Sequence, residues 1–270
     1  NAFRELLVIA KFTRDLRDRN LPCTQGIDLT AFLGDIGTIG DWNLEGLPTD
    51  PLSIENGILV TRSSRYPMLI DPQGQALNWI RNHEADRLPS FGTTVLSAPR
   101  LRDQLEFAMA EGQALIISGV EETIDPMLTP VLEKQIITKA KSKYINIGAK
   151  MCEYNETFML YMTTRLPNPH FSPEDQAKTT VVDFTVTQKG LEEQLLGRVI
   201  QKEQRSLEEQ LKNVLEEVTS NTKALLRLDE LLLERLSANT GNLLADEELL
   251  GVLAETKANA TEAPETRIAA

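Results

Sequence analysis

The sequence predicts an α/β domain followed by an all-α extension, and three observations support this prediction. Five short apolar runs lie within residues 66–186, and helical or turn-rich stretches separate them. Runs of this length that alternate with helices are typical of a parallel sheet covered by helices on both faces. From residue 189 onward the strand signals end, and Leu, Glu, Lys and Arg follow a heptad pattern. We therefore expect a three-layer sheet domain and then an antiparallel coiled-coil hairpin.

The apolar runs give the predicted strands of the sheet, and the amphipathic stretches between them give its helices. The predicted strands are Tyr66–Ile70, Thr93–Leu96, Ala114–Val120, Phe158–Thr163 and Thr180–Val186. The predicted helices are Ala76–Glu84, Leu101–Ala110 and Leu128–Ile137, with a small β-hairpin insert over Lys143–Tyr154.

The residues before this sheet give a weaker pattern. Residues 2–19 and Gly26–Phe32 have helical spacing. Gly34, Gly37 and Gly40 form G-x-x-G-x-x-G without the preceding strand that a dinucleotide loop needs, so we interpret them as a loop. Gly57–Thr61 is rich in β-branched residues and is a further strand candidate.

Composition excludes several classes of function. The net charge of −12 and the pI of about 4.8 argue against nucleic-acid binding and against docking on an anionic membrane. No apolar run reaches the length of a membrane span and no signal peptide is visible. Cys23 and Cys152 have no metal-ligand spacing and are interpreted as reduced thiols of a cytosolic-type protein. Asn1 in place of Met suggests a piece of a longer chain.

The first predicted strand leads into a turn and a helix, which is the context of a phosphate-binding loop. Such a loop needs G-x-x-x-x-G-K-[ST], because its Lys reaches the terminal phosphates and its hydroxyl binds Mg²⁺. Here Gln75 and Ala76 replace the Lys and the hydroxyl residue, and Leu69 replaces the first Gly. We interpret the site as a degenerate nucleotide loop, with an ordinary strand-turn-helix as the alternative. Its residues are Asp71, Pro72, Gln73, Gly74, Gln75 and Ala76.

Other candidate residues follow the later strands. Glu121 and Glu122 come after the third predicted strand, where an ATPase places the acids that hold Mg²⁺. Without the Lys and the hydroxyl this degenerate acidic pair has nothing to act with, and a charged helix cap or loop is the alternative. Arg165 follows the fourth predicted strand and either faces the nucleotide of a neighbouring module or forms a surface ion pair. The residues give no catalytic constellation and no metal site.

A heptad seam marks the extension. Apolar residues recur at alternating spacings of four and three, with Asn221 as a polar interruption that either fixes the register or faces water. A turn over Asn239–Asn242 would lead into a returning helix from Asp246. The seam residues are Leu207, Leu211, Val214, Val218, Leu225, Leu228 and Leu232.

Several longer motifs resemble the dynein heavy chain, and specifically the fifth AAA+ module of its motor ring. The resemblance covers nearly the whole chain in the order of the family. The sequence of residues 166–187 resembles axonemal dyneins more than cytoplasmic dyneins. The motifs are Trp42, then G-L-P-T-D-P-L-S-I-E-N-G-I-L-V (46–60), Y-P-M-L-I-D-P-Q-G-Q-A (66–76) with Trp79, G-V-E-E-T-I-D-P (119–126), N-P-H-F-S-P-E (168–174) and D-F-T-V-T-Q-K-G-L-E-E-Q-L-L (183–196).

The resemblance implies a large α/β AAA+ subdomain over residues 1–187. From residue 188 it implies the start of the helical small subdomain and of a buttress, or strut, hairpin. It also implies that this module does not hydrolyse ATP, so no cofactor is expected here, whereas neighbouring modules of the parent motor ATPase hold ATP and Mg²⁺. The implied partners are the neighbouring modules, the microtubule-binding stalk, the microtubule indirectly, and the intermediate and light chains. The implied location is the cytoskeleton, with the axoneme of a cilium or flagellum favoured over the cytoplasm.

This resemblance leads to the expectation of a non-catalytic module in a minus-end-directed microtubule motor. The module would transmit ATP-driven movements of the ring through its hairpin to the stalk. Two alternatives stay open at this stage. One is a nucleotide-binding AAA+ ATPase module with an unorthodox site, and the other is a passive coiled-coil scaffold.

Overall fold

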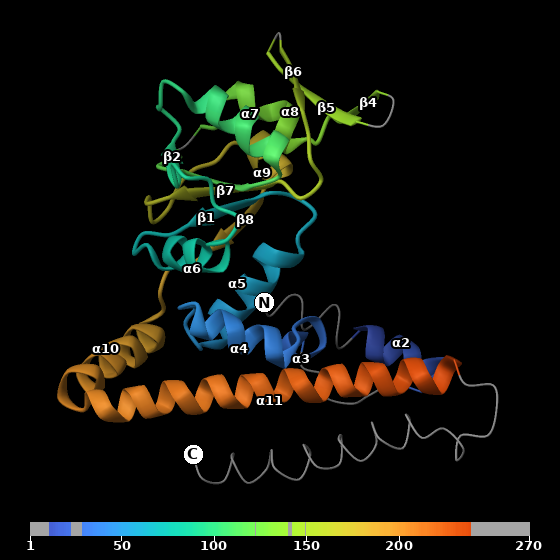
Figure 1. The fold of residues 1–270 in the computed structure, drawn as a ribbon, viewed down its shortest axis with the longest axis vertical. Helices are drawn as coiled ribbons and strands as arrows, with labels where there is room; N and C mark the ends of the chain where they lie inside the picture. The colour runs from blue at the N-terminus through green and yellow to red at the C-terminus, as the bar shows by residue number, and fades with distance from the viewer. Residues whose placement is uncertain (1–10, 23–28, 122, 140–141, 149, 239–270) are drawn as a thin grey trace. The chain divides into compact units, whose positions relative to one another are not determined.

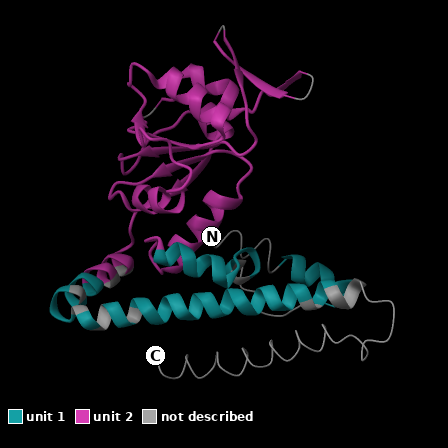
Figure 2. Cartoon of the chain, viewed as in Figure 1, with its two compact units in different colours: residues 1–44, 196–270 teal, residues 45–195 magenta. Residues whose placement is uncertain are grey.

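The computed structural model describes residues 11–22, 29–121, 123–139, 142–148 and 150–238 of the 270-residue chain. The chain forms two compact units, shown in two colours in Figure 2. One unit comprises residues 45–195 and the other comprises residues 1–44 and 196–270. Each unit is described by itself below.

The larger unit, which we call the sheet unit, contains a five-stranded, fully parallel sheet in the order β2-β3-β7-β1-β8 (Figure 1). The predicted parallel α/β sheet is confirmed, and each predicted strand is present with ends that differ by a few residues. In β1 and β7, Ile70 and Thr164 are opposite each other, so the carboxyl ends of these two strands meet. The strands are β1 (Pro67–Ile70), β2 (Thr93–Val95), β3 (Ala114–Ser118), β7 (Met159–Thr164) and β8 (Thr180–Asp183).

Helices cover both faces of this sheet, as the alternating pattern predicts. In Figure 1, α7 and α8 lie on one face, and α5 and α6 lie on the other. The core includes the fully buried β3 residues Leu115 and Ile117, which pack with Leu105 and Met109 of α7. The helices of this unit are α5 (Pro51–Arg62), α6 (Gln75–His83), α7 (Leu101–Glu111), η2 (Pro126–Leu128), α8 (Thr129–Leu132) and α9 (Pro173–Lys178), with α10 (Gln188–Glu203) continuing across the end of the unit.

The prediction of a strand over Gly57–Thr61 is wrong, because these residues belong to α5. The helix begins at Pro51 with Asp50 as its N-cap, whose carboxylate accepts from the Ser53 amide at 3.1 Å. The Thr61 hydroxyl donates to the Gly57 carbonyl at 2.9 Å, which satisfies this polar group inside the helix. Burial of Ile58 and Val60 against the sheet unit therefore outweighs their β propensity.

A three-stranded antiparallel sheet forms the insert, in the order β4-β5-β6. The strands are β4 (Ile137–Lys139), β5 (Ser142–Ile147) and β6 (Lys150–Glu153), so the predicted β-hairpin over Lys143–Tyr154 is confirmed. The predicted helix over Leu128–Ile137 is wrong in length. It reduces to α8, and the chain turns at Lys134, which has a positive φ of 50°.

The smaller unit is helical and centres on the pairing of α4 (Ile36–Leu44) with α11 (Arg205–Ala238). It also contains α2 (Phe12–Asp18) and α3 (Leu29–Leu33), in the regions where helices were predicted. The interpretation of Gly34, Gly37 and Gly40 as a loop is wrong for Gly37 and Gly40, which lie inside α4, and holds for Gly34, which precedes that helix. A Cβ atom on Gly40 would lie 2.6 Å from Thr219 Oγ1, and one on Gly37 would lie 2.9 Å from Lys223 Cγ. The glycines therefore let two helices approach closely.

The helix α11 contains the described part of the predicted seam. Val214, Val218, Leu225 and Leu228 are half-buried on it, as is Asn221. The side chains of Leu207, Leu211 and Leu232 and the predicted returning helix lie outside the described residues.

In the part of the chain that is described, no helix is both long enough and apolar enough to span a membrane.

Candidate functional site

The loop between β1 and α6 lies at the carboxyl edge of the parallel sheet, where α/β folds bind ligands. It comprises residues 71–74 and is held at the sheet by the Asp71 amide, which donates to the Thr164 carbonyl of β7 at 2.9 Å. Gly74 has a φ of +78°, which a residue with a side chain rarely adopts. This backbone leads directly into the first turn of α6, so its free N–H groups would suit an anion.

The carboxylate of Asp71 already binds these N–H groups. Its Oδ1 atom accepts from the Gln75 amide and its Oδ2 atom accepts from the Leu77 amide, both at 2.9 Å. The side chain is buried, and burial raises the pKa of the Asp71 carboxyl, while the backbone N–H groups of Leu77, Gln75, Gly74 and Ala76 act in the opposite direction. The loop therefore contains its own anion at the place where a phosphate would bind.

The side chain of Gln75, at the position where a nucleotide-binding loop has its Lys, is also hydrogen-bonded within the protein. The Gln75 side-chain amide donates to Gln194 Oε1 of α10 at 2.7 Å, and Gln73 Oε1 accepts from the Val186 amide at 3.3 Å. The cavity beside Gln75, lined also by Asn56, Phe184 and Gln194, holds only about 10 Å³. That volume is about enough for one water molecule.

The other predicted site residues lie in the loop or in the first turn of α6, or follow strands at the same edge of the sheet. Glu121 is exposed and lies three residues after the end of β3, and Glu122 lies outside the described residues. Arg165 is exposed directly after β7, at the same edge as the loop. Pro72 lies in the loop and Ala76 in the first turn of α6, and neither side chain carries a group that binds Mg²⁺. Among the described residues no group of three or more His, Cys, Asp or Glu side chains could hold a metal ion.

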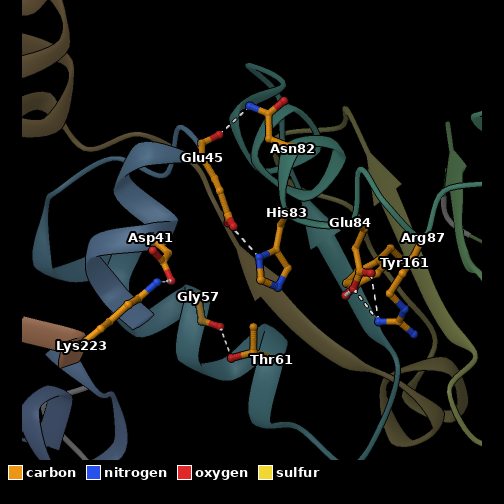
Figure 3. Close-up of polar contacts among 10 residues, drawn as sticks. All are labelled: Asp41, Glu45, Gly57, Thr61, Asn82, His83, Glu84, Arg87, Tyr161 and Lys223. Carbon is orange, nitrogen blue, oxygen red and sulfur yellow. Dashed lines mark hydrogen bonds and ion pairs between the residues drawn. The ribbon is translucent and has the colours of Figure 1, made fainter. Parts of the chain in front are cut away.

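The far end of α6 makes a second set of polar contacts, shown in Figure 3. The Asn82 side-chain amide donates to the Glu45 carbonyl at 2.5 Å, and His83 Nδ1 lies 2.8 Å from Glu45 Oε2. The His83 ring stacks on the fully buried Trp79 ring with centroids 5.7 Å apart. Backbone and side chain of Glu45 are therefore both held by α6.

A buried polar cluster follows directly after α6 (Figure 3). The Tyr161 hydroxyl of β7 donates to Glu84 Oε1 at 2.7 Å, and Arg87 Nη1 lies 3.0 Å from Glu84 Oε2. Glu84 is 5% exposed and Tyr161 is 2% exposed. Burial raises the pKa of the Tyr161 hydroxyl, and the neighbouring Glu84 charge acts in the same direction. The cluster satisfies a buried carboxylate and ties the end of α6 to the centre of the sheet.

Sequence reasoning missed three of these features. The role of the Asp71 carboxylate had no N-cap signal, because the residue directly before α6 is Gly74 and Asp71 lies four residues before the helix. The partnership of Gln75 with Gln194, 119 residues away, had no local signal. Nor had the contact between Glu45 and His83, which joins residues 38 positions apart.

Comparison with known proteins matches the chain to one family and to several curated relatives. Residues 40–263 match the family described as the ATP-binding dynein motor region. The chain is 50% identical over 265 residues to the dynein gamma chain of the flagellar outer arm of Chlamydomonas reinhardtii, and 45% identical over 263 residues to the human dynein axonemal heavy chain 8. It is also 40% identical over 266 residues to the human dynein axonemal heavy chain 10. Each match covers 97% of this chain but only 6% of the relative.

Proposed function

Because the chain belongs to the family of ATP-binding dynein motor regions, we propose that it is the fifth AAA+ module of an axonemal dynein heavy chain. In this proposal the module is non-catalytic and transmits ATP-driven movements of the motor ring to the microtubule-binding stalk. The parent chain would be a minus-end-directed microtubule motor of the cilium or flagellum, with ATP and Mg²⁺ bound by other modules. The large subdomain would span residues 1–187, and the helical part would begin at residue 188.

One observation supports the non-catalytic role most directly: Asp71 occupies the N–H groups of the loop with its own carboxylate. A triphosphate at this place would meet a buried negative charge instead of a lysine. The loop also lacks the hydroxyl that would bind Mg²⁺, because Ala76 stands at that position. A module with such a loop can respond to nucleotide only through its neighbours.

The long helix α11 supports the transmitting role. It is 34 residues long, so it extends about 50 Å at 1.5 Å per residue. A helix of this length converts a small rotation at its base into a larger displacement at its tip. Its contact with α4 includes the ion pair between Lys223 and Asp41 (Figure 3). The proposed partners are accordingly the neighbouring modules and the stalk directly, and the microtubule and the intermediate and light chains through the parent chain.

The transmitting role is tested in the full-length heavy chain with the seam variant Val218→Ala/Leu225→Ala. Both side chains are half-buried on α11, so their truncation should weaken the packing of the helix. We expect the variant to lose most of the nucleotide-dependent change in microtubule affinity while its ATPase activity persists. The matched control is Leu233→Ala on the same helix, where the side chain is 66% exposed. Unchanged coupling in the seam variant would contradict the proposal.

The competing function, nucleotide binding through the backbone alone, is separated by calorimetry. We expect Mg-ATP to give no heat of binding with the 270-residue chain. Because the Asp71 charge opposes an anion, Asp71→Ala should be the variant in which any residual affinity first becomes measurable. Micromolar binding by the unchanged chain would favour the nucleotide-binding alternative.

A further inference from the structure

The chain passes between its two compact units twice within the described residues. The first passage is the peptide bond between Leu44 and Glu45, and the second lies between Leu195 and Leu196. The helix α10 continues without a break through the second passage. Any movement of one unit that is transmitted through the chain to the other must therefore pass through these two points.

The start of α6 is hydrogen-bonded to Gln194, which lies just before the second passage. Gln75, the first residue of α6, donates from its side-chain amide to Gln194 Oε1 of α10 at 2.7 Å. Since Gln75 stands where a nucleotide-binding loop has its Lys, a position that would touch phosphate is used here to hold α10.

The end of α6 is bonded to the residue that follows the first passage. Asn82 donates to the Glu45 carbonyl at 2.5 Å, and His83 Nδ1 lies 2.8 Å from Glu45 Oε2 (Figure 3). Glu45 is joined by its peptide bond to Leu44, the last residue of α4, and α4 packs on α11 through Gly37 and Gly40.

The helix between these two contacts, α6, is fixed to the sheet by buried side chains and hydrogen bonds. Ala76, Trp79 and Ile80 are buried in the sheet unit, and the Trp79 ring lies against His83 and Phe184. At its start, Asp71 binds the amides of Gln75 and Leu77. A helix fixed in this way moves with the sheet as one body, so its two ends keep their separation.

We propose that α6 is a coupling helix that holds both passages of the chain, the second through Gln75–Gln194 and the first through Asn82 and His83 to Glu45. A displacement of the sheet unit then reaches α10 and the α4–α11 pair together. This inference rests on the proposed transmitting function and names the element that performs it. Gln75, Asn82 and His83 are positioning residues, because each acts through the residue that it contacts.

The test uses the full-length heavy chain with Gln75→Ala, Asn82→Ala and both changes together. Asn78→Ala is the matched control, because Asn78 is exposed on the same helix. Hydrogen exchange is measured around residues 191–197 and 44–47, and microtubule affinity is measured in each nucleotide state. We expect Gln75→Ala to speed exchange at the second passage and Asn82→Ala at the first, each by about two- to tenfold, the effect of losing one hydrogen bond.

We further expect the double variant to lose more than half of the nucleotide-dependent change in microtubule affinity, with Asn78→Ala unchanged. Exchange that matches the Asn78→Ala control at both passages overturns the proposal. The proposal is also overturned if exchange becomes faster but the full nucleotide-dependent change in microtubule affinity is retained, while the seam variant Val218→Ala/Leu225→Ala has lost that change. If the seam variant itself keeps its coupling, the proposed function fails, and the coupling helix fails with it.

Discussion

Gly40 of α4 packs so closely on Thr219 of α11 that a Cβ atom on the glycine would lie 2.6 Å from the Thr219 Oγ1 atom and 2.8 Å from its Cγ2 atom. Thr219 is 7% exposed and its β-branched side chain has little freedom to move aside. The same contact brings Lys223 to Asp41. The G-x-x-G spacing in α4 is thus a helix-packing device.

The first prediction concerns this contact. Gly40→Ala should force α4 and α11 apart, whereas Gly197→Ala in α10 meets nothing within 4 Å and gains helix propensity. We expect the free energy of unfolding of the Gly40→Ala variant to lie about 1–3 kcal/mol below that of Gly197→Ala. Urea denaturation of both variants, followed by circular dichroism, measures the difference. Equal stabilities would show that the two helices adjust without cost.

The second prediction concerns the pH dependence of stability. Burial raises the folded-state pKa of Asp71 above its ordinary value, so the folded chain holds this proton to higher pH than the unfolded chain. The contribution of Asp71 is therefore most favourable below the unfolded pKa of about 3.9 and is lost as pH rises through the folded pKa. The stability of the wild type minus that of Asp71→Asn should fall as pH rises through this window and then level off.

Denaturation of both proteins at a series of pH values measures this difference. The Asn variant retains one oxygen acceptor and cannot ionise, so it is the reference for the titration. A difference that grows with pH would mean that the amides of Gln75 and Leu77 outweigh the effect of burial on the carboxyl.

The strands were predictable from sequence because their signal is local. The first four residues of β3, ending at Ile117, are apolar and fully buried, and only the last residue, Ser118, is polar and half-buried, as expected for a central parallel strand. The error at Gly57–Thr61 came from reading β-branched residues without the cap before them. Asp50 and Pro51 together are a helix-start signal, and it was present in the sequence.

The loss of the loop's Lys and hydroxyl was also readable, since Gln75 and Ala76 stand in the motif itself. What replaced them was not. Gln194 lies on a helix 119 residues after Gln75, and Thr219 lies even further along the sequence from Gly40, so no local pattern connects either pair. Contacts of this kind depend on the assembled fold, so a single sequence carries no signal for the partner.

The third prediction concerns the thiol of Cys152. The side chain is 2% exposed in β6, and burial raises the pKa of the Cys152 thiol. Because the thiolate is the reactive form, alkylation should be slow in the folded protein. In a Cys23→Ser background, which leaves only Cys152, we expect iodoacetamide to label the chain at least about a hundredfold faster in denaturant than in buffer. Rapid labelling in buffer would show that the insert sheet opens readily.

The last prediction concerns the buried cluster at the end of α6. Tyr161→Phe removes the hydroxyl that donates to Glu84 at 2.7 Å and leaves Arg87 as the partner of that buried carboxylate. A buried charged acceptor that loses a donor costs about 1–3 kcal/mol. We expect the free energy of unfolding to fall by that amount.

Tyr144→Phe is the matched control for this variant, because Tyr144 is half-buried in β5 of the insert. It should change the free energy of unfolding by less than about 0.5 kcal/mol. Adding Glu84→Gln to Tyr161→Phe should recover part of the loss, since a neutral amide is cheaper to bury than a carboxylate with one partner missing. A double variant less stable than Tyr161→Phe alone would mean that the pairing of Glu84 with Arg87, and not the Tyr161 hydroxyl, holds the end of α6 to the sheet.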